Sequence, residues 1–125
     1  MLDREVVWKF SEGDEAKVQR TQEVAANEII VSPDDTIKCD QEAHIHSINS
    51  NTRTEIAFIN KLDSRVNVYW IDFAGARKLY SKLAPNGRVD LITFLTHPWV
   101  ITDATDRCLG LVLPQETPTR VVLAD

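Results

Sequence analysis

The feature that most constrains the fold is a series of short apolar segments, separated by turn residues at even intervals, over more than half of the chain. The sequence VNVYWID places Val66, Val68 and Trp70 on one face of a strand, because successive strand side chains point to opposite faces. Turn residues lie between the segments, and Asn86 and Gly87, which both tolerate positive φ, form the clearest turn. The expected strands are 54–60, 66–72, 78–83, 89–94, 99–102, 109–113 and 120–124. Strands at intervals of about 8–12 residues predict an all-β sandwich or barrel.

The composition is that of a single globular domain. The chain has 125 residues, of which 43% are hydrophobic and 26% are charged, and these fractions are ordinary for a soluble protein. No apolar run approaches the roughly 18 residues of a membrane span. The first ten residues carry acids where a signal peptide carries bases. We therefore expect a soluble, cytoplasmic protein with no membrane partner.

Charge divides the chain into two parts. Residues 1–42 hold eleven acids and five bases, a net charge of −6, whereas residues 43–125 hold eight acids and nine bases, a net charge of +1. This predicts an acidic N-terminal extension (1–42) followed by the sandwich domain (43–125). The absence of a basic patch argues against nucleic acid as a partner.

The extension is expected to be partly helical. Residues 14–30 are rich in Glu, Ala, Gln and Lys, which favour helix. A short helical turn is expected over 33–39, because Ser32 and Pro33 resemble an N-cap and a first helical position. Within the sandwich, we expect four residues to be buried: Phe58, Val68, Leu91 and Leu111.

The cysteines and histidines give no clear chemical site. Two cysteines, Cys39 and Cys108, are far from a disulfide-rich pattern, and we expect free thiols in a reducing compartment. A metal site would need His44 and His46 together with a third ligand such as Cys39, Asp40 or His97. His-x-His on a strand points both rings the same way, but no convincing third ligand follows. We expect no metal and no cofactor.

Motifs of catalysis are missing from the sequence. It contains no Gly-x-Ser-x-Gly, no glycine-rich phosphate loop and no Cys placed near a His at a strand end. No pair of carboxylates stands out from the surface acids. The chain is therefore predicted not to be an enzyme.

An ordered set of residues in the strand series is similar to a known family. The set is Phe58, Asn60, Arg65-Val66, Trp70, Phe73, Gly75, Tyr80, Leu83, Pro85, Gly87, His97-x-Trp99 and Asp103-Ala104. It resembles the β-domain of the von Hippel–Lindau (VHL) tumour suppressor, over about residues 54–113. The resemblance implies a seven-stranded, prealbumin-like antiparallel β-sandwich.

The resemblance also implies a ligand, because that family recognises a hydroxylated proline in hypoxia-inducible factor. Tyr80, Thr93, His97 and Trp99 fall where the family lines its hydroxyproline pocket, and Trp70 falls where an aromatic residue forms a wall. Aromatic rings offer flat apolar surface to a pyrrolidine ring. Thr93 and His97 together offer a donor and an acceptor to one hydroxyl group.

Several positions depart from the family pattern. Thr93 stands where the family has serine, Phe94 replaces a tyrosine, Ile92 replaces a histidine, and Pro98 within the His-x-Trp motif is new. The helical domain that recruits elongin C in the family has no counterpart after Leu113, so elongin C is not expected as a partner of this chain.

Two functions stay open at this point. One is a module that reads hydroxyproline in an extended peptide. The other is a protein-interaction or accessory sandwich domain of a larger protein that does not read hydroxyproline, for which Trp70 is a core residue, Thr93 an ordinary strand residue and His97 part of a turn. Dependence of binding on the proline hydroxyl separates the two.

Overall fold

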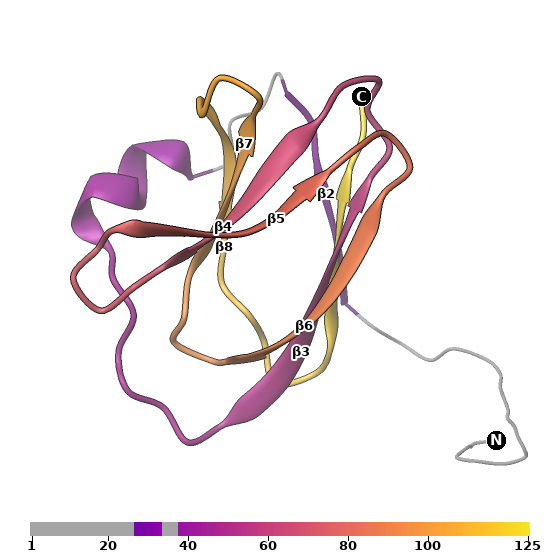
Figure 1. The fold of residues 1–125 in the computed structure, drawn as a ribbon. Helices are drawn as coiled ribbons and strands as arrows, with labels where there is room; N and C mark the ends of the chain where they lie inside the picture. Colours follow the sequence, from indigo (N-terminus) through magenta and orange to yellow (C-terminus); the bar gives the residue numbers. More distant parts are fainter. Residues whose placement is uncertain (1–26, 34–37) are drawn as a thin grey trace, which may run out of the picture.

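The computed structural model describes residues 27–33 and 38–125, which form two four-stranded sheets packed face to face (Figure 1). The strands are β2 (Asn27–Val31), β3 (Arg53–Asn60), β4 (Val66–Ile71), β5 (Arg77–Leu83), β6 (Arg88–Phe94), β7 (Trp99–Asp103), β8 (Cys108–Val112) and β9 (Thr119–Leu123). One 3₁₀ helix, η1 (Cys39–His44), precedes β3. The predicted β-sandwich is confirmed, and all seven expected strands form.

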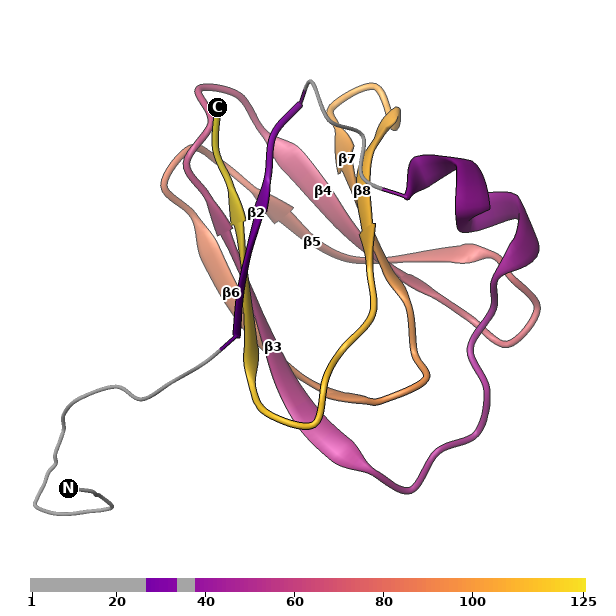
Figure 2. The same ribbon diagram turned by 180° about the vertical axis from the view of Figure 1, so that it is seen from behind.

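The strand order places β5 and β6 at the edges of different sheets. One sheet has the order β2-β9-β3-β6 and the other has the order β5-β4-β7-β8. β9 runs parallel to both β3 and β2, and Figure 2 shows β2 beside it. The first sheet is therefore mixed, not wholly antiparallel as expected, whereas all pairs in the second sheet are antiparallel.

The prediction of a helix over residues 14–30 is wrong for its last residues, which belong to strand β2. Residues 27–30 are extended and pair with β9, and residues 14–26 lie outside the described part of the chain. Val31 is fully buried and Ile29 packs against the core. Pairing and burial in the sheet outweigh a helix propensity of a few tenths of a kcal/mol per residue. Residues 27–31 thus contribute a strand to the sandwich.

The helical turn expected over 33–39 falls largely outside the described residues. The structure has its helix just beyond, at Cys39–His44. Lys38 precedes this helix with a left-handed backbone, φ 59°.

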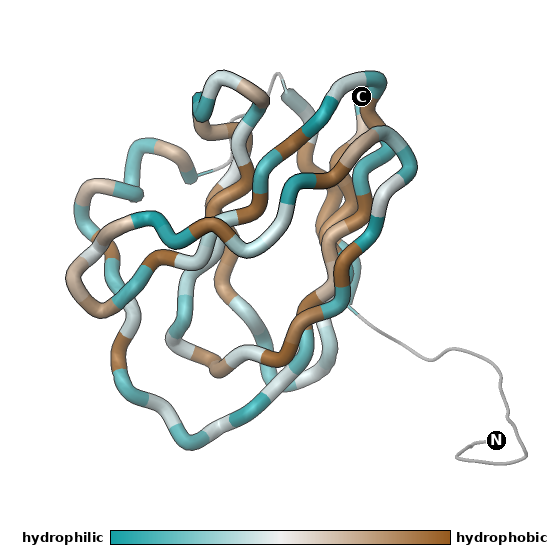
Figure 3. The backbone as a smooth tube through the Cα atoms, viewed as in Figure 1, coloured by the Kyte–Doolittle hydropathy of each residue, from teal (hydrophilic) through white to brown (hydrophobic). Residues whose placement is uncertain are grey.

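The main core lies between the two sheets and is formed by apolar residues from the strands of both. Figure 3 shows hydrophobic positions along these strands. Phe58 and Val68 are fully buried, as predicted, and Leu91 is partly buried against them. Leu111 is 2% exposed but belongs to a second, smaller cluster with Ile71 and Val100. This cluster comes from the alternate residues of β4, β7 and β8, so the second sheet buries apolar side chains on both faces.

The connection from β5 to β6 crosses from one sheet to the other. Asn86 has φ 69°, as its turn propensity predicts. Gly87 is required for a different reason, because a Cβ there would lie 2.9 Å from the carbonyl oxygen of Ala84. The buried amide of Asn60 donates to the carbonyl oxygens of Ser64 and Leu83, at 2.9 and 3.0 Å. These contacts hold β5 and β6 at the same end of the sandwich.

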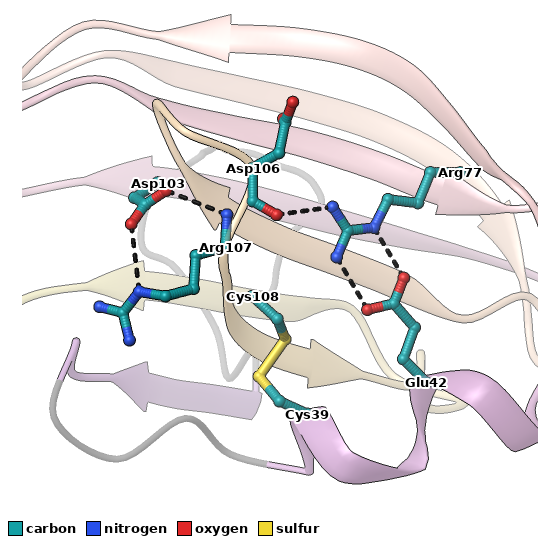
Figure 4. The surroundings of a disulfide bond; sticks show 7 residues. All are labelled: Cys39, Glu42, Arg77, Asp103, Asp106, Arg107 and Cys108. Carbon is teal, nitrogen blue, oxygen red and sulfur yellow. Dashed lines mark hydrogen bonds and ion pairs between the residues drawn. A yellow bond between two sulfur atoms is a disulfide. The ribbon is translucent and has the colours of Figure 1, made fainter.

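A disulfide joins Cys39 to Cys108, so the expectation of free thiols is wrong (Figure 4). The two residues are 69 positions apart, with Cα atoms 5.9 Å from each other. Only the folded arrangement, in which η1 packs against β8, brings them together. Within the described residues, no helix has the length and apolar character needed to cross a membrane.

Candidate binding site

A cavity of about 170 Å³ opens where the edge strands β5 and β6 face each other across the two sheets. β5 supplies Tyr80, β6 supplies the run from Ile92 to Phe94, and β4 and β7 supply one tryptophan each. The lining residues are Trp70, Tyr80, Ile92, Thr93, Phe94, His97 and Trp99. All five residues singled out from the sequence therefore lie around one cavity, together with Ile92 and Phe94.

Aromatic rings form most of the cavity wall. The ring of Tyr80 meets Trp99 edge-on, with centroids 5.1 Å apart, and meets Trp70 edge-on at 6.3 Å. Such edge-to-face contacts are favourable arrangements of two π-systems. Tyr80 is 54% exposed and lies at the mouth, whereas Trp99 is 2% exposed and packs on Phe58 of the core. The wall thus runs from the surface into the core of the sandwich.

Thr93 already has one partner within the fold. The indole N–H of Trp99 donates to Thr93 Oγ1 at 3.0 Å, and both residues are buried. A hydroxyl group has one donor and two acceptor positions. This bond uses one acceptor position of Thr93 and leaves its O–H able to donate into the cavity.

His97 lies among three aromatic rings. The centroids of Trp70, Phe73 and Phe94 are 5.6, 5.5 and 5.3 Å from that of its imidazole. Burial lowers the pKa of His97 below its ordinary value of 6.5, and a hydrogen bond to the backbone of Ile48 opposes this in part. The folded protein therefore favours the neutral form of His97. A neutral imidazole that donates from one nitrogen keeps the other as an acceptor.

The segment before β3 holds two residues of the cavity wall, His97 and Trp70. Ile48 of this segment bonds to His97 through its backbone, and Ser47 bonds to Trp70. The indole N–H of Trp70 donates to Ser47 Oγ at 2.8 Å, and this hydroxyl donates to the carbonyl oxygen of Ile71 at 2.5 Å. Ser47 is 2% exposed. Neither Ser47 nor Ile48 was singled out from the sequence, because both precede the regular strand series and carry no motif of their own.

Phe73, which is 50% exposed, borders the cavity through its contacts with Trp70 and His97. The position of Phe73 is fixed by a tight turn. In this turn, Asp72 Oδ1 accepts hydrogen bonds from the backbone N–H groups of Ala74 and Ala76, at 2.9 and 2.8 Å. The bond from Ala76 makes the largest contribution to lowering the pKa of Asp72. The resemblance named Phe73 but assigned it no contact with the ligand.

A larger hollow of about 470 Å³ lies elsewhere, over β3, β6 and β9. Acidic and basic side chains border this hollow, among them Glu55, Arg88, Asp90 and Arg120. Of its described lining residues, Ile92 also lines the aromatic cavity. Size alone is a weaker indication of a binding site than an apolar cavity with a few placed polar groups.

Cys39, one of the residues considered as a metal ligand beside His44 and His46, is not available to a metal ion. Cys39 is bonded to Cys108, and His46 Nδ1 lies 2.9 Å from the carbonyl oxygen of Ser47. In the part of the chain that the structure describes, no three His, Cys, Asp or Glu side chains lie where they could hold one ion.

The family model of the VHL beta domain matches residues 45–116, more than half of the chain. The chain belongs to the VHL beta domain family. Membership of the VHL beta domain family indicates a protein-interaction module. The matched region contains every residue that lines the aromatic cavity, as well as Ser47, Ile48 and Phe73. Strands β2 and β9 and Cys39 lie outside it, so the disulfide joins the VHL beta domain to the segment before it.

Proposed function

We propose that this domain binds an extended peptide and that the aromatic cavity takes the ring of a 4-hydroxyproline. One observation carries the proposal. Thr93 and His97 line the same cavity, and each has one hydrogen-bonding position satisfied by the fold and at least one left over. The leftover positions are a donor on Thr93 and an acceptor on His97, which is the pair that a single hydroxyl group satisfies.

This arrangement predicts discrimination against proline. The ligand hydroxyl would accept from Thr93 and donate to His97, while the pyrrolidine ring packs on Tyr80 and Trp70. A proline ring would displace water from the cavity and leave both protein groups without a partner. Each unsatisfied group costs roughly 1–3 kcal/mol, so the two together favour hydroxyproline by about 30-fold to more than 10,000-fold.

The sheet edge beside the cavity suits the flanking residues of a peptide. β6 is the last strand of its sheet among the described residues, so within that part of the chain one side of its backbone has no strand partner. An extended peptide binds such an edge with main-chain hydrogen bonds. Three consecutive residues of β6, Ile92 to Phe94, also line the cavity, so a peptide paired with β6 would pass over its opening.

The proposal is binding without catalysis. Among the described residues that line the cavity there is no carboxylate, cysteine or lysine, and the hydroxyl oxygen of Thr93 already accepts the indole N–H of Trp99. These groups suit recognition of a hydroxyl better than a covalent step.

The experiment is a titration of the ¹⁵N-labelled protein with two small amides, N-acetyl-4-hydroxyproline methylamide and N-acetylproline methylamide. These ligands test the cavity without assuming a peptide sequence. We expect the hydroxylated amide to shift the indole N–H signal of Trp99, because its acceptor, Thr93, is the group that the ligand hydroxyl approaches. Equal shifts with the two amides, or no shift with either, would overturn the proposal.

A second function is favoured by the exposed apolar residues around the cavity. Phe73, Tyr80 and Ile92 are each about half exposed, at 50%, 54% and 51%. This surface could contact a protein partner that carries no hydroxyproline. Such a partner would bind equally well with proline or hydroxyproline at the cavity, and the paired ligands therefore separate the two functions.

A further inference from the structure

Residues 39–48, which we call the strap, connect the disulfide to the aromatic cavity. The strap begins in η1 beside β8, and its residue Ile45 packs against the small cluster of Ile71, Val100 and Leu111. The strap then reaches the cavity, where the backbone N–H of Ser47 donates to the carbonyl oxygen of Asp72 at 3.0 Å.

The first end of the strap has two anchors, which Figure 4 shows side by side. One is the disulfide between Cys39 and Cys108, both of which are partly exposed. The other is a bidentate ion pair in which Arg77 Nε and Nη2 donate to the carboxylate of Glu42, at 2.7 and 2.9 Å. Arg77 Nη1 also donates to the carbonyl oxygen of Asp106, at 2.8 Å. A bidentate pair of this kind fixes orientation as well as distance.

The second end of the strap holds two residues of the cavity. Ser47 Oγ accepts the indole N–H of Trp70. The carbonyl of Ile48 accepts the hydroxyl of Thr96, and the Ile48 backbone also takes the hydrogen bond from the ring of His97. The backbone N–H of Ile48 donates back to the carbonyl oxygen of Thr96 at 3.3 Å. The orientations of Trp70 and His97 therefore depend on where the strap lies.

We propose that the strap positions Trp70 and His97 for the ligand and that the Cys39–Cys108 disulfide makes this positioning redox-sensitive. This inference rests on the proposed function. In the oxidised protein, the cavity has the form described above. A dithiol reductant would attack one sulfur, break the S–S bond through a mixed disulfide, and leave as a cyclic disulfide. Its two electrons and two protons would leave Cys39 and Cys108 as thiols.

Reduction would leave the ion pair as the remaining anchor. The side chains of Arg77 and Glu42 are 27% and 21% exposed, so solvent weakens this pair relative to a buried one. The strap would then open locally more often, which exposes the bonds that Ser47 and Ile48 make. Removing Glu42 as well would release both anchors.

The first test needs no ligand and measures hydrogen exchange of the two cavity indoles. Reduction with dithiothreitol should speed exchange of the Trp70 indole N–H by about tenfold, since its acceptor Ser47 is on the strap. The Trp99 indole N–H is the internal control, because its acceptor Thr93 is on β6. The reduced Glu42→Gln variant should show a larger effect on Trp70. A Cys39→Ser/Cys108→Ser variant should exchange quickly from the start and should not respond to dithiothreitol.

The second test measures binding of N-acetyl-4-hydroxyproline methylamide before and after reduction. Affinity should fall by about three- to tenfold in the wild type and should not change in the double serine variant, because the cavity loses its preorganised form. Ser47→Ala should also weaken binding, and Ser47→Thr, which keeps the hydroxyl, should restore it.

The two proposals fail in different ways. If the amide does not bind but Trp70 exchange responds to reduction, the proposed function is wrong and the strap still positions the wall. If the amide binds but neither Trp70 exchange nor affinity changes on reduction, even in Glu42→Gln, the strap proposal is wrong. Exchange of Trp99 at the same rate as Trp70 after reduction would also overturn it, because both indoles would then exchange through general unfolding and not through local opening of the strap.

Discussion

Trp99 and Thr93 act as a pair that belongs both to the core and to the cavity. The indole of Trp99 is 2% exposed, packs on Phe58 and donates to Thr93 Oγ1. The Thr93 hydroxyl oxygen therefore has a partner in the fold without a ligand, while its O–H is left able to donate to a further acceptor. A threonine at this position serves the structure and keeps a donor for recognition.

The first prediction separates these two roles of Thr93. Thr93→Val keeps the shape of the side chain but leaves the buried Trp99 N–H without an acceptor, which should lower the free energy of unfolding by about 1–3 kcal/mol. It should also abolish the preference for hydroxyproline over proline. Thr93→Ser keeps the hydroxyl and is the matched control. Urea denaturation measures the stability, and a valine variant as stable as the serine variant would contradict this account.

The second prediction concerns the protonation of His97. Its pKa is lowered by burial, so the folded protein disfavours the charged ring that the unfolded chain accepts more readily. The stability from this residue is fully present above the unfolded pKa of about 6.5 and is lost as the pH falls through the lower, folded pKa. Binding should follow the same direction, because a protonated ring has no acceptor.

Calorimetric titration of the hydroxylated ligand between pH 5 and 8, taken as an order-of-magnitude window around the His pKa, checks this dependence. The affinity should be flat above about pH 6.5 and should fall as the pH drops through the lower pKa that His97 has in the folded protein. His97→Ala is the control, and an equally steep fall in that variant would mean that another group is responsible.

At the scale of the elements, the strands could be predicted from the sequence. The pairings between residues far apart in the chain could not. Every strand from β3 to β9 was predicted within one or two residues, because each buries alternate side chains. β2 was not, because NEII has no clear alternation and its extended form depends on pairing with β9. The Cys39–Cys108 bond was missed for a similar reason, since 69 intervening residues give no local signal.

The cavity was predictable to the same degree. The residues that line it sit on strands and one turn whose order matches a family pattern. The support from Ser47 and Ile48 was not predictable, because it comes from an irregular segment whose path the strand pattern does not determine. Trp99 also needs a correction: with 2% exposure it is a core residue as well as a wall residue. Trp99→Ala would therefore cost about 3–5 kcal/mol of stability and would not test binding alone.

The third prediction uses β5, whose neighbouring residues Tyr80 and Leu79 are exposed to similar extents, 54% and 49%. Tyr80→Ala should weaken binding of the hydroxylated and the plain ligand alike, because it removes apolar wall that either ring uses. Its stability should stay within about 0.5 kcal/mol of the wild type, as for most surface changes. Leu79→Ala is the control, since Leu79 has a similar exposure but is not among the residues that line the cavity. Loss of binding in Leu79→Ala, or none in Tyr80→Ala, would place the ligand elsewhere.

At the scale of the whole molecule, the second sheet is covered on both faces. The main core lies on one side, and the smaller cluster on the other side is covered by the strap. The disulfide closes this arrangement by joining the strap to β8. Disulfides persist in oxidising compartments, so the bond does not fit the free thiols in a reducing compartment that were expected from the sequence.

The fourth prediction measures what this closure contributes. A cross-link over a loop of this length stabilises mainly by restricting the unfolded chain, typically by about 2–4 kcal/mol. The Cys39→Ser/Cys108→Ser variant should lose that much in urea denaturation, while its far-ultraviolet circular dichroism keeps the β signature. Dithiothreitol should destabilise the wild type to a similar extent and leave the variant unaffected. An unchanged denaturation midpoint in both cases would show that the bond contributes nothing to the fold.

The fifth prediction tests the central claim, that the cavity reads a hydroxyl group on proline. The ligands are the tightest-binding peptide from a library with a fixed central 4-hydroxyproline, and its twin with proline at that position. Calorimetry with the oxidised wild-type protein should give an affinity about 30-fold to more than 10,000-fold higher for the hydroxylated peptide. His97→Ala should remove most of that difference without unfolding the protein. Equal affinities of the wild type for the two peptides would contradict the claim and would assign Thr93 and His97 to the fold alone.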